Sequence, residues 1–161
     1  MINPRTFTFG GTSAIVTSMG LIIGLESATV PAATIVSGLL IVAVADNISD
    51  SLSIHMYQEA ERLDQRVALR ATIINFLARL LVALSFVLIV ALLPVFSAAI
   101  VALAWGFLLL ACLSYILARA RGVSPLTEVG KHLGIAILVI VASRLIGTWI
   151  LGHVPTGSFP R

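Results

Sequence analysis

The fold is decided by residues 80–118, "LLVALSFVLIVALLPVFSAAIVALAWGFLLLACLSYILA", which contain no charged side chain. Pro94 divides this stretch into two apolar runs, and the second, residues 95–118, exceeds the roughly 20 residues that a helix needs to cross a bilayer. The first run continues back to about residue 71, with Arg79 as the one charged residue of that extension. The rest of the chain is similar, because 59% of the 161 residues are hydrophobic and only 11% are charged. Soluble domains carry about 25% charged residues. The composition excludes an ordinary soluble domain and predicts an all-α membrane protein.

Hydropathy predicts five transmembrane helices, at about residues 8–25, 32–55, 71–93, 97–117 and 133–151. The first run could pass for a signal peptide because "VPAA" (residues 30–33) follows it, but its length and internal glycines favour a helix that is retained. The five helices leave room only for short loops. We therefore expect one five-span transmembrane domain over residues 1–161, in which residues 56–70 form a short cytoplasmic helical link.

The basic residues are distributed unequally between the two sides that five spans would create. One side holds the N-terminus and the loops after the second and fourth spans, with Arg5, Arg62, Arg66, Arg70, Arg119, Arg121 and Lys131. The other side holds only Arg161. Because basic loops stay in the cytoplasm, the N-terminus is predicted to be cytoplasmic and the C-terminus to lie outside.

Four ionisable side chains fall inside the predicted spans, namely Asp46, Asp50, Arg79 and Arg144. Such groups are costly in a membrane, so each is a candidate functional residue. Asp46 and Asp50 lie one helical turn apart, and in a poorly solvated place one of them should hold a proton unless a cation replaces it. This is the chemistry of proton and metal exchange. Oxygen ligands without a thiolate suit Mn²⁺ or Fe²⁺ better than Cu⁺.

A static alternative also fits these four residues. Asp46 and Asp50 would pair with Arg79 and Arg144 as buried ion pairs that fix helix register and transport nothing. For Arg79, about nine residues into its span, we instead expect a side chain that extends to the cytoplasmic interface.

Other polar residues are expected to assist the two aspartates. Oxygen ligation or lining of a pathway is assigned to Ser13, Thr17, Ser49 and Ser53, and the cytoplasmic mouth to His55 and Glu59, an i, i+4 pair. The acidic residues after the second span, including Glu61, form either a surface that collects metal ions or a solvated helical link with internal ion pairs.

Several classes of protein are excluded. There is no basic patch with stacking aromatic residues, so no nucleic-acid partner is expected. The chain also lacks the HExxH, GxSxG, Walker and CxxC motifs, and we expect no enzymatic activity. The single cysteine, Cys112, is expected to be a small buried packing residue.

Two segments resemble one membrane protein family. "FGGTSAIVTSMGLIIGL" (residues 9–25) and "SGLLIVAVADNISDSLSIHMYQEAE" (residues 37–61) resemble the vacuolar iron transporter family, most closely its short prokaryotic members. The resemblance implies a five-span homodimer in a prokaryotic inner membrane, which exports Fe²⁺ or Mn²⁺ from the cytosol in exchange for protons. It implies no tightly bound cofactor. By position, Asp46 and Ser49 match residues of the family's second-span motif, and Glu59 and Glu61 fall where that helix extends into the cytoplasm.

The chain departs from the family pattern at three places. Better-known members have an aspartate and a glycine where this chain has Ser13 and Ala14, and a methionine where it has Asp50. We hypothesise that Asp50 supplies the charge that the first span lacks. The larger metal-binding insert of longer members is replaced by residues 56–70.

The sequence therefore predicts a proton-coupled exporter of divalent metal ions, which dimerises through the small-residue face of Gly20 and Gly24. One alternative is a membrane scaffold or assembly partner that transports nothing. Another is a proton-coupled exporter of small organic cations.

Overall fold

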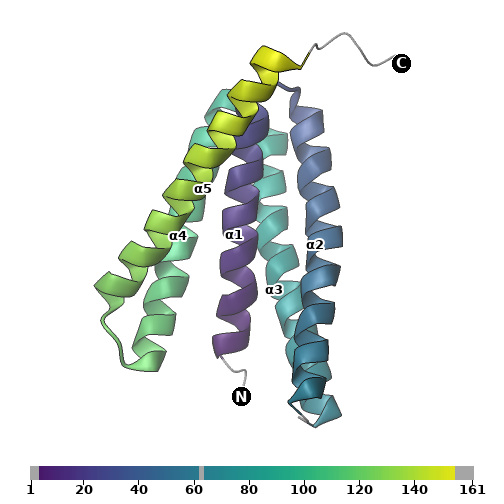
Figure 1. The fold of residues 1–161 in the computed structure, drawn as a ribbon, viewed down its shortest axis with the longest axis vertical. Helices are drawn as coiled ribbons and strands as arrows, with labels where there is room; N and C mark the ends of the chain where they lie inside the picture. Colours follow the sequence, from purple (N-terminus) through teal and green to yellow (C-terminus); the bar gives the residue numbers. More distant parts are fainter. Residues whose placement is uncertain (1–3, 62–63, 155–161) are drawn as a thin grey trace.

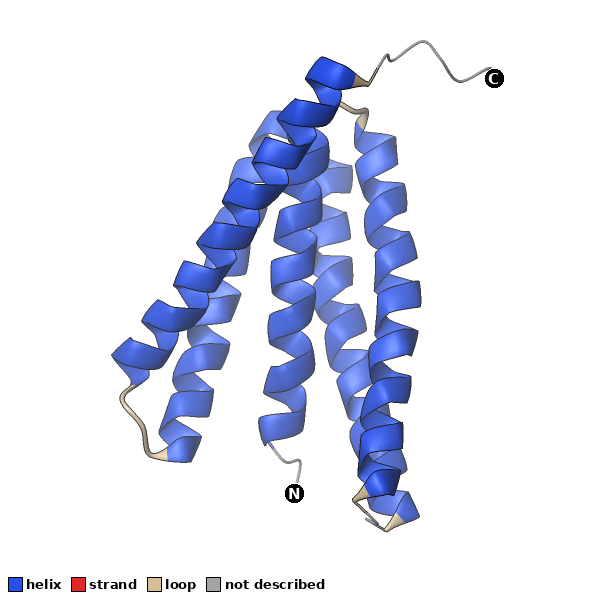
Figure 2. Cartoon of the chain, viewed as in Figure 1, coloured by secondary structure: helices blue, strands red, loops and turns tan. Residues whose placement is uncertain are grey.

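The computed structural model describes residues 4–61 and 64–154, with side chains described from residue 11 onward. This part of the chain consists of helices joined by short connections (Figures 1 and 2). The five helices are α1 (Pro4–Ser27), α2 (Ala32–Ala60), α3 (Gln65–Leu92), α4 (Val95–Arg121) and α5 (Pro125–His153). The predicted all-α class is thus confirmed. The α2, α3, α4 and α5 helices are each long and apolar enough to cross a membrane, whereas the apolar part of α1, Gly11–Ser27, is shorter.

The helices alternate in direction along the chain (Figure 1). One end of the bundle, here called the amino end, holds the start of α1 and the connections α2–α3 and α4–α5. The opposite end, called the carboxyl end, holds the connections α1–α2 and α3–α4 and the end of α5. Five basic side chains gather at the amino end: Arg66, Arg70, Arg119, Arg121 and Lys131.

Large apolar side chains cover the outside of the bundle. Leu81, Leu88, Leu138 and Leu145 are all more than half exposed, although each lies well inside its helix. An aqueous surface would oppose this arrangement, whereas lipid chains would not. The outer surface is that of a membrane protein.

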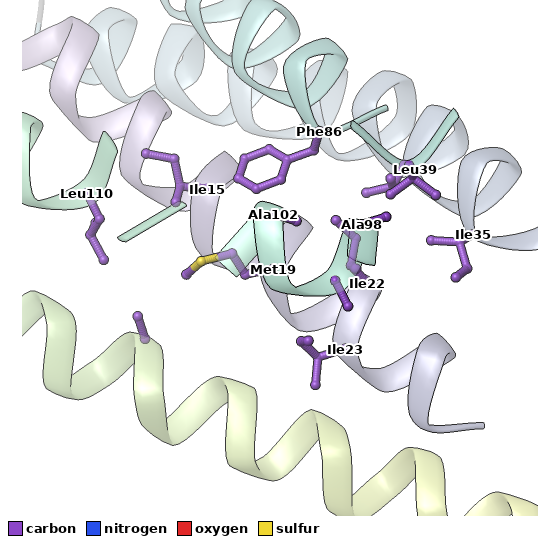
Figure 3. Packing of buried hydrophobic residues seen from close by; sticks show 13 residues of the cluster. Ile15, Met19, Ile22, Ile23, Ile35, Leu39, Phe86, Ala98, Ala102 and Leu110 are labelled. Atoms are coloured by element: carbon purple, nitrogen blue, oxygen red, sulfur yellow. The ribbon is translucent and has the colours of Figure 1, made fainter. Parts of the chain in front are cut away.

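The apolar core is built around α1. Ile15, Met19 and Ile22 of this helix are essentially inaccessible, and they pack among Phe86 of α3 and Ala102 of α4 (Figure 3). Gly106 of α4 lies directly against the Met19 sulfur, so a side chain at this position would displace the methionine. No side chain of α1 from residue 11 to Ser27 is exposed, so this helix is the most enclosed of the five.

The small-residue face of α1 packs against α5 of the same chain. A Cβ at Gly20 would lie 3.0 Å from Ser143 Oγ, and a Cβ at Gly147 would collide with the Gly24 carbonyl oxygen. Small residues four apart on both helices allow this close approach. The face that we expected to bind a second copy is thus occupied within the protomer, because α5 supplies a matching pair of small residues.

The connection between α2 and α3 differs from the expected helical link over residues 56–70. The α2 helix continues to Ala60, and α3 already begins at Gln65. The Asp64 carboxylate accepts hydrogen bonds from the Arg66 and Val67 backbone N–H groups, which fixes the start of α3. Most of this segment therefore consists of the ends of two long helices.

Candidate functional site

The charged residues of α2 and α3 meet halfway along both helices. Asp46 is the middle residue of α2, which runs from Ala32 to Ala60, and Arg79 lies at the middle of α3. At 1.5 Å per residue, Arg79 is about 21 Å from the start of its helix at Gln65. The charges are thus far from both ends of the bundle.

Arg79 binds both aspartates. Its Nη2 lies 2.5 Å from Asp46 Oδ2, and its Nη1 lies 2.5 Å from Asp50 Oδ2. The arginine side chain is only 2% exposed, whereas the Asp46 and Asp50 side chains are 42% and 33% exposed. One guanidinium thus holds two carboxylates that open outward from the bundle, and the ionised trio carries a net charge of −1.

The expectation that Arg79 extends to an interface is wrong. The apolar segment begins after Arg70, which puts Arg79 about nine residues into the predicted span. The α3 helix, however, begins at Gln65. The arginine is therefore too deep to reach the end of the bundle, and the carboxylates of α2 neutralise it at that depth.

Arg144 takes no part in this arrangement. It is exposed on the outer face of α5, and its backbone carbonyl accepts a hydrogen bond from Thr148 Oγ. The α5 helix packs mainly against α1 and α4, away from the aspartates of α2. The static alternative paired the aspartates with both arginines; the pairing with Arg79 is confirmed, and the pairing with Arg144 is wrong.

A small cleft lies beside the charged trio. Its volume is about 10 Å³, which is room for about one water molecule. It lies between α1, α2 and α3 and is lined by Ala14, Thr17, Ser18, Leu39, Val42, Ala43, Asp46, Asn47, Arg79 and Ala83. Thr17 thus lies where we expected a residue lining a pathway, Ser18 joins it, and Ser13 is not part of the lining.

Uncharged polar side chains extend from this cleft between α2 and α3. The Asn47 amide donates a 2.9 Å hydrogen bond to the Phe76 carbonyl oxygen, and Asn75 of α3 is completely buried. Ser51, one turn beyond Asn47, is also buried. None of these three residues was predicted from the sequence as part of the site. Two asparagines inside apolar helices were the available signal.

The other predicted ligands lie apart from the trio. Ser49 and Ser53 are exposed on α2, and Ser53 Oγ donates to the Ser49 carbonyl oxygen, 3.0 Å away. His55 Nε2 lies 3.4 Å from Glu59 Oε1, which confirms that i, i+4 pair. Glu61 is exposed at the end of α2. These residues follow the helix toward the amino end and do not join the aspartates.

A metal centre is not complete within one protomer. Among the residues that the structure describes, no three His, Cys, Asp or Glu side chains come close enough to share a metal ion. The trio offers two carboxylates, and Arg79 already binds both of them.

Two further residues lie outside the site. Cys112 is exposed on the outer surface of α4, so the expectation that it is buried is wrong. His132 of α5 forms a 2.7 Å hydrogen bond with the buried Ser114 Oγ, which joins α4 to α5 near the amino end. Neither residue contributes to the site between α2 and α3.

The chain matches no known protein family, no curated protein and no solved structure. The site must therefore be interpreted from its own geometry.

Proposed function

We propose that the protein is a proton-coupled transporter of a divalent metal ion, Fe²⁺ or Mn²⁺, and that it is related to the vacuolar iron transporters. The observation that carries the proposal is the pairing of two carboxylates with a single buried arginine halfway along two long helices. Charged groups at such a depth are costly and are typical of ion pathways and proton relays. The positive charge of Arg79 balances the charge of only one carboxylate. The trio can therefore bind a proton or help to bind a cation.

The proposal places five helices across a prokaryotic inner membrane, with the amino end in the cytoplasm. The asymmetry of the basic residues supports this orientation, because Arg66, Arg70, Arg119, Arg121 and Lys131 share the amino end. The α1 helix, although short in its apolar part, would cross the membrane because the other four helices enclose it.

A second copy of the chain would complete the metal site. The Asp46 and Asp50 side chains are partly exposed on the side of α2 that also exposes Ser49 and Ser53, and lipid chains would not cover such a polar strip favourably. A homodimer in which the two α2 helices face each other would cover it. Four carboxylates would then meet, which is a donor set that suits Fe²⁺ or Mn²⁺.

Exchange follows from charge balance in this arrangement. When a metal ion binds, the carboxylates release any protons they carry, since metal ligands must be deprotonated. When protons arrive from outside, they neutralise carboxylates and weaken metal binding. Arg79 remains charged throughout, so the site never becomes a bare cluster of negative charges.

The second candidate is a scaffold that transports nothing. It is favoured by one observation, namely that Arg79 already pairs with both aspartates and joins α2 to α3. In that case the trio only fixes the register of the two helices.

Uptake of Fe²⁺ and Mn²⁺ into proteoliposomes with an imposed pH gradient tests the proposal. Asp46→Asn and Asp50→Asn each leave one carboxylate for Arg79, so both variants should fold, and each should lose most gradient-driven uptake. Asp64→Asn is the matched control, because it removes an exposed carboxylate yet keeps the oxygen that caps α3. Competition by divalent metals separates metal transport from the export of organic cations.

Absence of uptake by well-folded wild-type protein would favour the scaffold. The scaffold also predicts a specific pattern of stability. Each single variant would change thermal stability little, whereas Asp46→Asn with Asp50→Asn would destabilise the fold by leaving Arg79 without a carboxylate.

A further inference from the structure

The interface between α2 and α3 contains a column of buried polar atoms that lack hydrogen-bond partners. Within the described part of the chain, these atoms are Asn47 Oδ1, Ser51 Oγ, His55 Nδ1, Gln58 Oε1, Asn75 Oδ1 and Asn75 Nδ2. We call these five residues the polar seam. Such a concentration is unusual, because buried polar groups are nearly always hydrogen-bonded to protein or to ordered water.

The four seam residues of α2 lie on one face of that helix. At 100° per residue, Asn47, Ser51, His55 and Gln58 fall within about 80° of one another. Asn47 bonds to the Phe76 carbonyl oxygen, so this face is directed at α3. The seam therefore extends between two packed helices over about three turns.

Asn75 completes the seam from the side of α3. It lies one turn before Arg79, whose side chain reaches the aspartates of α2, so both residues occupy the face directed at α2. Asn75 is 0% exposed, and neither its amide oxygen nor its amide nitrogen has a partner. An unpaired buried amide is destabilising in an apolar setting, and hydrogen bonds to water would remove that cost.

One end of the seam lies at the cleft, and the other lies near the end of α2. At its inner end, Asn47 lines the cleft beside Asp46 and Arg79, which has room for about one water molecule. At its outer end, Gln58 is next to Glu59, two residues before α2 ends at Ala60. The seam thus runs from the charged trio to the amino end of the bundle.

We propose that water occupies the polar seam and that this water carries protons between the charged trio and the amino end. The role in proton transfer rests on the proposed exchange function, whereas the presence of water does not. The aspartates exposed on the other side of α2 would then bind the metal ion, so protons and metal would reach the trio from different sides.

Accessibility of substituted cysteines to Ag⁺, an ion of about the size of water, tests for water without measuring transport. In a Cys112→Ala background, Ser51→Cys and Asn75→Cys place a thiol in the seam. Ala118→Cys is the control, because Ala118 is as buried as Asn75 but lies nearer to the amino end, three residues before α4 ends at Arg121. Free thiols remaining after Ag⁺ exposure are counted by maleimide labelling of the denatured protein.

We expect Ag⁺ to block the seam thiols about tenfold faster than Ala118→Cys, since a thiol in apolar surroundings ionises poorly. Adding Asn75→Leu to Ser51→Cys should reduce its reactivity to the control rate, because leucine closes the seam with apolar surface. Equal rates at Ser51, Asn75 and Ala118 would overturn the proposal. So would unchanged reactivity after Asn75→Leu.

The transport assay separates the two proposals. If seam thiols react quickly but Asp46→Asn transports normally, the seam is hydrated and the proposed function is wrong. If wild-type uptake is proton-coupled but the seam thiols do not react, the water route is wrong and the function stands. A hydrated seam in which Asn75→Leu leaves gradient-driven uptake unchanged would show that protons take another path.

Discussion

Two helix pairs in this protein are held together by opposite means. The α1–α5 pair approaches closely because Gly20 and Gly24 face Ser143 and Gly147, so backbone packs against small side chains. The α2–α3 pair is joined by the bonds of Arg79 to Asp46 and Asp50 and by the bond from Asn47 to the Phe76 carbonyl oxygen.

The two contacts differ in how much room they leave for water and charge. The α1–α5 contact has no room for water or for a charge, because even one methyl group on Gly147 would collide with the Gly24 carbonyl oxygen. The α2–α3 contact retains polar atoms without partners and a cleft beside its charges. The α1–α5 pair is held by close packing, whereas the α2–α3 pair carries the charged and polar groups. The following predictions test that distinction.

The largest effect is expected from Arg79→Met. Removing the guanidinium leaves two carboxylates one turn apart without a cation, and breaking a buried ion pair costs about 3–5 kcal/mol. Thermal unfolding in detergent should show a much lower midpoint. Arg144→Met is the control, because this arginine is exposed and should be nearly neutral. Equal losses in both variants would contradict the central role of Arg79.

Gly147→Val should destabilise the other helix pair by about 3 kcal/mol, the upper part of the usual range for overpacking. The new side chain meets the Gly24 carbonyl oxygen, which cannot move without displacing α1. Gly134→Val is the control on the same helix, since nothing lies within 4 Å of its Cβ position. If the two variants unfold at the same temperature, the close approach of α1 and α5 is not needed for stability.

Gly20→Ala should cost about 1–2 kcal/mol, because the added methyl lies only 3.0 Å from Ser143 Oγ. Ser143→Gly removes that oxygen and should relieve part of the cost. A double-mutant cycle of unfolding free energies should therefore give a coupling of about 0.5–1 kcal/mol. Simple additivity would mean that the two residues do not press against each other.

The smallest effect, about 1 kcal/mol, is expected from Asp64→Ala at the exposed start of α3. The change removes the acceptor for the Arg66 and Val67 N–H groups, far from the buried trio. Asp64→Asn should keep most of the stability, and gradient-driven uptake should be normal in both variants. A loss of uptake in Asp64→Asn would extend the functional region to the end of the bundle.

Much of the fold could be predicted from sequence because a continuous apolar segment marks each helix. Long apolar runs, together with Pro31, Pro94 and Pro125, indicate where the helices lie. The predicted helix ends agree with the observed ends to within a few residues, except where a helix extends beyond its apolar segment. The extension matters most in α3. Its start at Gln65 lies before the apolar segment begins, and this shift moved Arg79 from a supposed interface to the middle of the helix.

The site could be predicted only in part because it depends on which helices are neighbours. Spacing alone placed Asp46 and Asp50 on one strip, but it could not choose between Arg79 and Arg144 as their partner. The role of Gly20 and Gly24 was similarly open, since a small-residue face suits any close helix. Asn75 was missed for a different reason, because an uncharged residue hardly changes the hydropathy of its segment.

The contact between α1 and α5 also constrains the order in which the protein assembles. The ribosome makes α1 well before α5, so the glycine face of α1 stays uncovered until α5 has been added. Until then, that face is open to other small-residue helices in the membrane. The α5 helix thus closes this face of α1.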